Sequence, residues 1–231
     1  MNTGQCLVSL IPIRAENSER SEQVSQLLFG ETYEILDQTE KWAFIQSKHD
    51  NYKGWIDLKL VSELNFEPNL NCVHTNTPAF IEFGGKKILV SPGSFLPNTL
   101  SEKADVFKLF SDHCGIPYVW GGKSFFGLDC SGFVQIYFRC LGVELPRDAY
   151  QQANVGNTIH LLEESHTNDL AFFDNSEGKI THVGIIIRNM DHFSILHASG
   201  ELRIDALDYN GIHKKNAGYS HSLRLIQRVT N

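Results

Sequence analysis

Just past its middle the chain reads Leu128-Asp129-Cys130-Ser131-Gly132-Phe133, a stretch that predicts the start of a helix. Asp129 is of a residue type favoured at the N-cap. Apolar residues then recur at helical spacing up to Gly142, namely Cys130, Phe133, Val134, Tyr137, Phe138 and Leu141. Cys130 is therefore predicted to lie in the first turn, where free N–H groups and the helix dipole favour a thiolate and a developing oxyanion.

Two histidines lie in strand-like segments further along the chain. His182 is in the apolar run 181–187, and His197 is in the run 193–198. If a hairpin turn is centred between Asn189 and Met190, paired residues sum to about 379, and the two histidines are directly opposed, with Cβ atoms about 4.5–5.5 Å apart. One imidazole can then take the thiol proton while the other orients it. Cys130, His182 and His197 are the predicted catalytic residues.

The pattern around this cysteine indicates an α+β domain. Thr99-Leu100-Ser101-Glu102 fits a capping box, and a helix is predicted from Ala104 until Gly115 ends it. Strands are predicted after the two helices, at 170–173, 181–187, 193–198 and 202–204. Helices followed by an antiparallel run are typical of the α+β class.

The N-terminal part is predicted to be a separate, small all-β barrel. Short strands are expected at 6–13, 32–36, 42–46 and 54–56, with polar turns between them. Four of the seven prolines then mark a connector, in which residues 80–83 and 87–90 form a hairpin around Gly84-Gly85. The predicted division is residues 1–66 for the barrel, 67–98 for the connector and 99–231 for the catalytic domain.

The composition and charge of the chain limit the kinds of partner and the location that we expect. The chain has 231 residues and a formal charge of -7, which disfavours nucleic acid and anionic membranes. No apolar run approaches the roughly 18 residues of a spanning helix, and no signal peptide is recognised, so a cytoplasmic location is expected. The five cysteines are widely spaced and include no C-x-x-C pair, so neither a disulfide framework nor a zinc site is expected. No metal and no cofactor are expected.

Five ordered motifs resemble those of the NlpC/P60 cysteine peptidases over about residues 100–231. The motifs are Tyr118-x-Trp120-Gly121-Gly122, Asp129-Cys130-Ser131-Gly132-Phe133, Leu145-Pro146-Arg147, Thr181-His182-Val183-Gly184-Ile185 and Leu196-His197-Ala198. The resemblance implies a papain-like core with Cys130, His182 and His197 as the triad and Tyr118 on the oxyanion side. Asn168 departs from the family pattern, because it stands where a glycine is common before Asp169-Leu170.

The N-terminal strands resemble a bacterial SH3-like domain, and the whole layout is similar to the γ-D-glutamyl-L-diamino-acid endopeptidases. That subgroup implies hydrolysis after γ-D-Glu in L-Ala-γ-D-Glu-diamino acid murein peptides with a free N-terminal L-Ala, in cell-wall peptide recycling. It also implies that Asp129 and Tyr52 hold the α-ammonium group. The third peptide residue, diaminopimelate or lysine, and the oligomeric state stay open.

Other roles remain for the neighbouring polar residues. Arg147 and Asp148 either bind the substrate or form a structural ion pair, and Ser131 either donates to substrate or supports the first helical turn. Asp129 also has a capping role, and Tyr52 is otherwise a surface aromatic of the barrel.

Two alternative functions are compatible with the same sequence. The first is an amidase or acyltransferase on the same core, because fold alone does not determine the acceptor. The second is an inactive wall-binding module, against which the intact set of Cys130, His182 and His197 argues.

Overall fold

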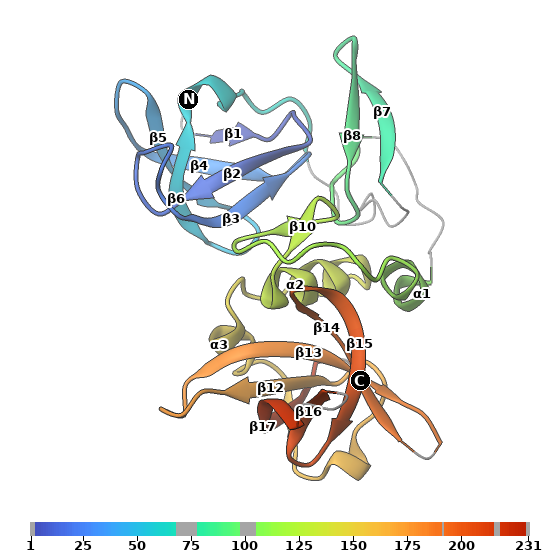
Figure 1. Ribbon diagram of the computed structural model, residues 1–231. Helices are drawn as coiled ribbons and strands as arrows, with labels where there is room; N and C mark the ends of the chain where they lie inside the picture. Colours follow the sequence, from blue (N-terminus) through green and yellow to red (C-terminus); the bar gives the residue numbers. More distant parts are fainter. Residues whose placement is uncertain (1–2, 68–77, 98–104, 191, 215–217, 230–231) are drawn as a thin grey trace.

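The computed structural model describes residues 3–67, 78–97, 105–190, 192–214 and 218–229. Two β-rich parts lie at opposite ends of the molecule, and helix α2 (Cys130–Cys140) lies between them (Figure 1). Among the described residues, no helix has the length and apolar character needed to cross a membrane.

The N-terminal part is a six-stranded antiparallel sheet in the order β1-β4-β5-β6-β2-β3. Its strands are β1 (Thr3–Gln5), β2 (Leu10–Arg14), β3 (Gln23–Leu28), β4 (Thr32–Gln38), β5 (Trp42–Ser47) and β6 (Lys53–Asp57), followed by a 3-10 turn at Leu58–Leu60. Alternate apolar side chains such as Ile11, Ile13 and Ile45 fill its core. This small all-β unit is the one that the sequence predicted.

Two details of that prediction are wrong. Only the second half of the expected strand at 6–13 is a strand, namely β2, because Cys6 exchanges backbone hydrogen bonds with Gly30 and Glu31 and the chain bends at residues 8–9. Strand β3 was not predicted. Its buried Ser25 and Gln26 interrupt the apolar pattern because they accept hydrogen bonds from the catalytic domain, namely from Arg147 and the Lys123 backbone.

The predicted connector hairpin is present as β7 (Ala79–Phe83) and β8 (Lys86–Val90). Gly84 and Gly85 at its tip both have positive φ, which glycine adopts without steric cost. Next to this turn, Phe83 packs edge-on against Phe29 of the N-terminal unit, with ring centroids 5.3 Å apart. The hairpin therefore packs on the N-terminal unit through an apolar cluster that is separate from the core of the six-stranded sheet.

Helix α1 (Val106–Ser111) begins at Asp105, whose carboxylate accepts a hydrogen bond from the Lys108 N–H. The predicted capping box at residues 99–102 lies outside the described residues. Helix α2 follows the short strands β9 (Lys123–Ser124) and β10 (Gly127–Leu128), and it begins after Asp129 as predicted. Its residues from Cys130 to Arg139 are all buried, because the helix is covered from two sides.

The C-terminal part is an antiparallel sheet in the order β11-β17-β12-β13-β14-β15-β16, and β17 also pairs with β16. Strands β12 to β17 therefore close into a barrel. After helix α3 (Ala149–Gln152), the elements are β11 (Asn157–Ile159), a 3-10 turn (Leu162–Glu164), β12 (Leu170–Asp174), β13 (Ile180–Arg188), β14 (Phe193–Ser199), β15 (Glu201–Asp208), β16 (Gly211–Lys214) and β17 (Gly218–Arg228). The α+β class is confirmed, whereas β11, β16 and β17 were not predicted.

Asn168 lies in the turn before β12 with φ of +79°, a backbone conformation that glycine and asparagine adopt more readily than other residues. Its Oδ1 accepts a hydrogen bond of 2.6 Å from the Tyr137 hydroxyl. The departure from the common glycine therefore keeps the turn and adds a contact to α2.

A buried cluster of charges joins the two parts. Glu31 of the N-terminal unit accepts hydrogen bonds from Lys123, at 2.8 Å, and from Arg139 of α2. Asp50 accepts a hydrogen bond of 3.0 Å from Gln135 on the same helix. The charged side chains in this cluster are at most 1% exposed. Because each is paired across the interface, the cluster holds the N-terminal unit in one position on α2.

Candidate active site

Cys130 opens into a pocket of about 570 Å³ at the junction of the two parts. The N-terminal unit contributes Glu22, Val24 and Tyr52 to its walls. The catalytic domain contributes Tyr118, Trp120, Asp129, Cys130, Ser131, Arg147, Asp148, Ala149, Tyr150, Ile180 and Thr181. The structure therefore brings Tyr52 to the same pocket as the predicted residues around the cysteine.

A second, smaller pocket of about 250 Å³ adjoins the first, since both are lined by Tyr118 and Thr181. His182 lines it together with His221, Ala198, Ser199 and Gly200. Cys130 lines the larger pocket and His182 lines the smaller one, and the two pockets meet at Tyr118 and Thr181.

The environment of Cys130 raises the pKa of its thiol to about 11. Burial is the main cause and the Asp129 carboxylate adds to it, while hydrogen bonds from the Val183 and Ser131 N–H groups act in the opposite direction. The expected preference for a thiolate is therefore outweighed by desolvation in the free protein. The resting form is a thiol, and a base must remove its proton for attack.

His182 and His197 lie within hydrogen-bonding distance, 2.8 Å from Nε2 of His182 to Nδ1 of His197. The predicted register is wrong, because β13 and β14 pair Ile185 with Leu196 and Arg188 with Phe193, so that paired residues sum to 381 and not 379. The turn is centred one residue later than assumed, with the Asn189 N–H bonded to His192 O. A shift of two residues in the register keeps both histidines on one face of the sheet. The two rings therefore still reach each other.

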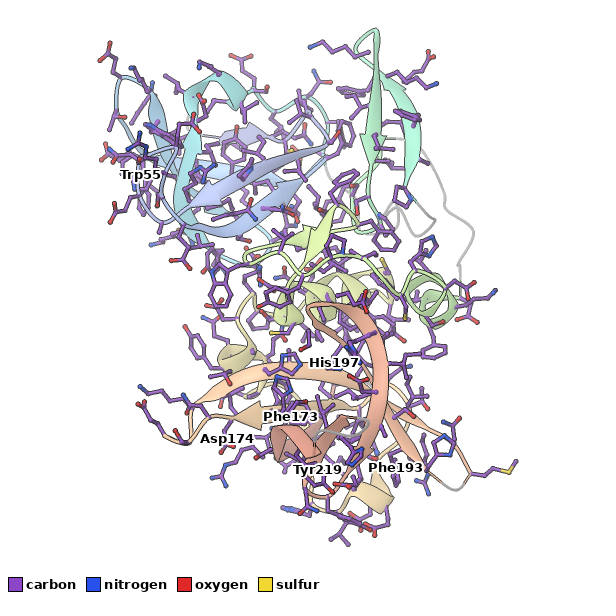
Figure 2. All side chains as sticks on the ribbon, in the orientation of Figure 1. Trp55, Phe173, Asp174, Phe193, His197 and Tyr219 are labelled. Carbon is purple, nitrogen blue, oxygen red and sulfur yellow. The ribbon has the colours of Figure 1, made fainter. Side chains whose placement is uncertain are left out.

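Close approach of the rings depends on Gly184. A Cβ built on this residue would lie 2.8 Å from the His197 Cβ and 2.7 Å from the Ile195 side chain. His197 lies near the centre of the molecule, above Phe173 in the view of Figure 2. Any larger residue at position 184 would therefore push on the strand segment that carries His197.

Both imidazoles are predominantly neutral near pH 7. Burial lowers the pKa of His182 well below its ordinary value, and the neighbouring His197 and His221 lower it further. Burial also lowers the pKa of His197, to about 4, although Asp205 acts against this. A neutral His182 is in the protonation state that a general base requires.

Sequence reasoning missed two residues of this cluster. Asp205 Oδ2 lies 3.1 Å from His197 Nε2, and its other oxygen accepts a hydrogen bond of 2.8 Å from Arg203. His221 stacks on His182 with ring centroids 4.2 Å apart. The alternation of side chains along the strands that follow His197 was a signal that could have placed Asp205 on the same face of the sheet as His197. No signal pointed to His221, because β17 itself was not predicted.

Asp129 has the capping role that the sequence predicted and a second role. Its Oδ1 accepts from the Gly132 N–H at 2.7 Å, and its Oδ2 accepts from the Gly121 N–H at 2.8 Å. Arg147 binds both oxygens, at 3.0 and 2.6 Å, and also donates to the Ser131 hydroxyl. Of the alternatives for Arg147, the structure contains the ion pair, in which Asp129 rather than Asp148 is the partner.

Acidic groups outnumber basic groups on the walls of the larger pocket. Glu22, Asp129 and Asp148 face a single cation, Arg147. Burial raises the pKa of Asp148, partly offset by Arg147, and burial raises the pKa of Tyr52 to about 12, so that its hydroxyl keeps its proton. The pocket therefore favours a cationic group. The described residues include no cluster of histidine, cysteine or acidic side chains suited to a metal ion.

Comparison with known proteins agrees with this geometry. Residues 115–220 match the model of the NlpC/P60 family, and residues 13–59 match that of the bacterial dipeptidyl-peptidase SH3 domain. The murein DD-endopeptidase MepS/murein LD-carboxypeptidase of Escherichia coli (strain K12) is 33% identical over 135 residues, which are 58% of this chain and 68% of that protein.

The γ-D-glutamyl-L-lysine dipeptidyl-peptidase of Bacillus subtilis (strain 168) is 42% identical over 85 residues, 36% of this chain. This chain spans only 28% of that relative's length. A solved NlpC/P60 family protein from Bacillus cereus ATCC 10987 has the same fold, with a TM-score of 0.79 at 17% identity over 98% of this chain and 99% of that one.

Proposed function

The chain belongs to the NlpC/P60 family, and we propose that it is a cysteine endopeptidase that hydrolyses the γ-D-Glu–diamino acid bond of murein peptides with a free N-terminal L-Ala. The observation that carries the proposal is the position of Cys130 in an acidic pocket that the N-terminal unit helps to enclose. The ammonium group at the amino terminus of a short peptide is a cation, and it can interact with the carboxylates that line this pocket.

The proposed reaction begins when His182 takes the proton of Cys130, and the sulfur attacks the γ-D-Glu carbonyl carbon. The oxyanion forms beside Tyr118 and the N–H groups at the start of α2. Burial keeps the pKa of Tyr118 above its ordinary value, so that its hydroxyl remains a donor.

Collapse of this intermediate breaks the C–N bond, and His182 transfers its proton to the leaving amine. Water then gives a proton to His182 and attacks the thioester. Release of the L-Ala-γ-D-Glu carboxylate and return of the proton restore the thiol. Protons and electrons balance with no further reactant.

We assign the selection of peptides with a free amino terminus to the acidic residues that line the pocket. Because the oxygens of Asp129 are engaged by Arg147 and two backbone N–H groups, its contribution to binding an ammonium is mainly electrostatic. Asp148 and the Tyr52 hydroxyl line the same pocket and are the proposed direct partners. An acetylated terminus has no charge and leaves these groups desolvated without compensation.

A role in recycling of soluble murein peptides in the cytoplasm is part of the same proposal. A pocket enclosed by a second domain suits a peptide end better than a cross-linked wall. The ordered His182–His197 pair supports catalysis over a purely wall-binding role. Whether the acyl group of the thioester passes to water or to an amine is a question for experiment.

The test is incubation of the purified protein with L-Ala-γ-D-Glu-diaminopimelate, with the corresponding lysine peptide and with the N-acetylated form of each, followed by mass spectrometry. We expect release of L-Ala-γ-D-Glu from the free peptides only, and no release by Cys130→Ala. Equal cleavage of acetylated peptides would contradict the assignment to the acidic residues that line the pocket. Products joined to an added amine would identify a transferase instead.

A further inference from the structure

The second ring nitrogen of His197 is held by a carboxylate. Its Nε2 lies 3.1 Å from Asp205 Oδ2, and Arg203 holds the other oxygen of Asp205 at 2.8 Å. Burial by itself raises the pKa of Asp205, but the hydrogen bonds from Arg203 and His197 outweigh it, and the pKa lies below its ordinary value. An ionised carboxylate only accepts hydrogen bonds.

The pairing of two neighbouring strands places this carboxylate beside His197. Strands β14 and β15 are joined by a tight turn at Gly200, whose φ is +76°. The turn pairs His197 with Arg203, so that Asp205, two residues on, lies on the same face of the sheet. The side chain of Asp205 is 13% exposed, and the contact is therefore largely shielded from water.

We propose that Asp205 is a positioning residue that sets the tautomers of both histidines and so leaves Nδ1 of His182 free to accept the thiol proton. The inference rests on the proposed function, in which His182 is the base. Because Asp205 only accepts, Nε2 of neutral His197 carries its proton and Nδ1 carries a lone pair. That lone pair lies 2.8 Å from Nε2 of His182, which therefore carries the proton of that ring.

The same chain of contacts stabilises the charge that catalysis creates. When the S–H bond of Cys130 breaks and an N–H bond forms at Nδ1 of His182, the ring becomes an imidazolium. Its Nε2–H then bonds more strongly to His197, whose own Nε2–H is drawn toward Asp205. His221, stacked on His182 from β17, and Arg203 oppose this charge, which makes the anionic end of the chain of contacts more important.

The first test needs no substrate. We would label the protein with ¹⁵N-histidine and record imidazole nitrogen spectra of the folded wild type near pH 7. We expect His182 and His197 both to be protonated at Nε2 and bare at Nδ1. A proton on Nδ1 of either ring would overturn the proposal, and this measurement does not depend on whether any variant folds.

The second test uses Asp205→Asn, whose amide can donate to His197 Nε2 and reverse that tautomer. We expect the rate of Cys130 alkylation by iodoacetamide and kcat to fall by about tenfold to a hundredfold, the range typical for lost carboxylate partners of metal-binding histidines, with KM little changed. Asp208→Asn is the matched control, because Asp208 lies on the same strand and accepts a hydrogen bond from Tyr219 instead of from His197.

The readouts separate the two proposals. If the protein fails to cleave murein peptides but Asp205→Asn still slows alkylation and shifts the His197 signals, the proposed function fails and the positioning role stands. Unchanged alkylation and unchanged tautomers in a folded Asp205→Asn protein would reject the positioning role, whatever the substrate proves to be.

Discussion

Arg147 binds both carboxylate oxygens of Asp129, the residue directly before the proposed nucleophile. The guanidinium also donates to Ser25 of the N-terminal unit and to Ser131 of α2. One buried side chain therefore joins the cap of the catalytic helix, its first turn and the neighbouring domain. Residues that a sequence pattern assigned to substrate binding prove to be bound to each other.

Arg147→Lys should remove this connection although the charge is kept. A lysine ammonium cannot span both oxygens of Asp129 and reach the two serines as well. We expect the free energy of unfolding to fall by about 1.5–3 kcal/mol, measured by urea titration. Arg224→Lys is the control, because Arg224 is 63% exposed in its pair with Asp174 and should change stability by less than about 0.5 kcal/mol. Equal losses in the two variants would contradict this account.

Gly184→Ala should disturb the histidine pair, because the added methyl would collide with the His197 Cβ and with Ile195. Overpacking of this kind costs about 1–3 kcal/mol of stability, and kcat should fall as well. Adding Ile195→Val removes the contact with Cδ1 but leaves the contacts with Cγ1 and with the His197 Cβ. In the double variant we expect thermal stability to recover more than kcat does. Full recovery of both would show that the contact with His197 is unimportant.

Tyr52→Phe and Asp148→Asn should each raise KM for the free peptide more than they lower kcat. Both residues line the pocket at a distance from the transferred proton, so their loss removes binding rather than chemistry. Tyr209→Phe serves as the control, since Tyr209 is exposed and lines a different pocket. The assignment to ammonium binding is rejected if steady-state kinetics show kcat falling while KM for the free peptide stays constant.

Glu31→Gln should destabilise the junction of the two parts strongly. The change leaves Lys123 and Arg139 buried without their shared carboxylate, a situation that costs about 3–5 kcal/mol. Glu34→Gln, on the exposed face of β4, should change the unfolding free energy little. Calorimetry distinguishes the outcomes, and a melting temperature equal to that of Glu34→Gln would refute the importance of the cluster.

Stability should fall as the pH is lowered from about 6.5 toward 4. His49 and His197 both have pKa values near 4 in the folded protein, lowered mainly by burial, whereas an unfolded chain binds their protons near pH 6.5. Between these values the unfolded state holds more protons, so each histidine contributes a loss of about 1.4 kcal/mol per pH unit.

Replacement of one histidine tests this slope. His49 Nε2 accepts a hydrogen bond from the Thr32 N–H, and glutamine can provide an acceptor there without titrating. His49→Gln should therefore flatten the dependence of unfolding free energy on pH between 6.5 and 4.5. The exposed Thr158→Gln, which removes no titrating group, should leave it unchanged, and equal slopes in both variants would contradict the assignment.

Local sequence was sufficient for the elements whose signals are local. The Asp129 cap, the apolar stripe of α2 and the Gly84-Gly85 hairpin depend on residues a few positions apart, and all three were predicted. The placement of both histidines on one face also followed from strand alternation, which tolerates a register error of two residues.

Only the tertiary structure decided how distant segments meet. Strand β17 carries His221 to His182 because the C-terminal sheet closes on itself, and nothing near residue 221 encodes that closure. Tyr52 reaches the pocket because buried charges dock the N-terminal unit on α2. The resting protonation of Cys130 likewise follows from burial, which is a property of everything packed around a thiol and not of its neighbours in the chain.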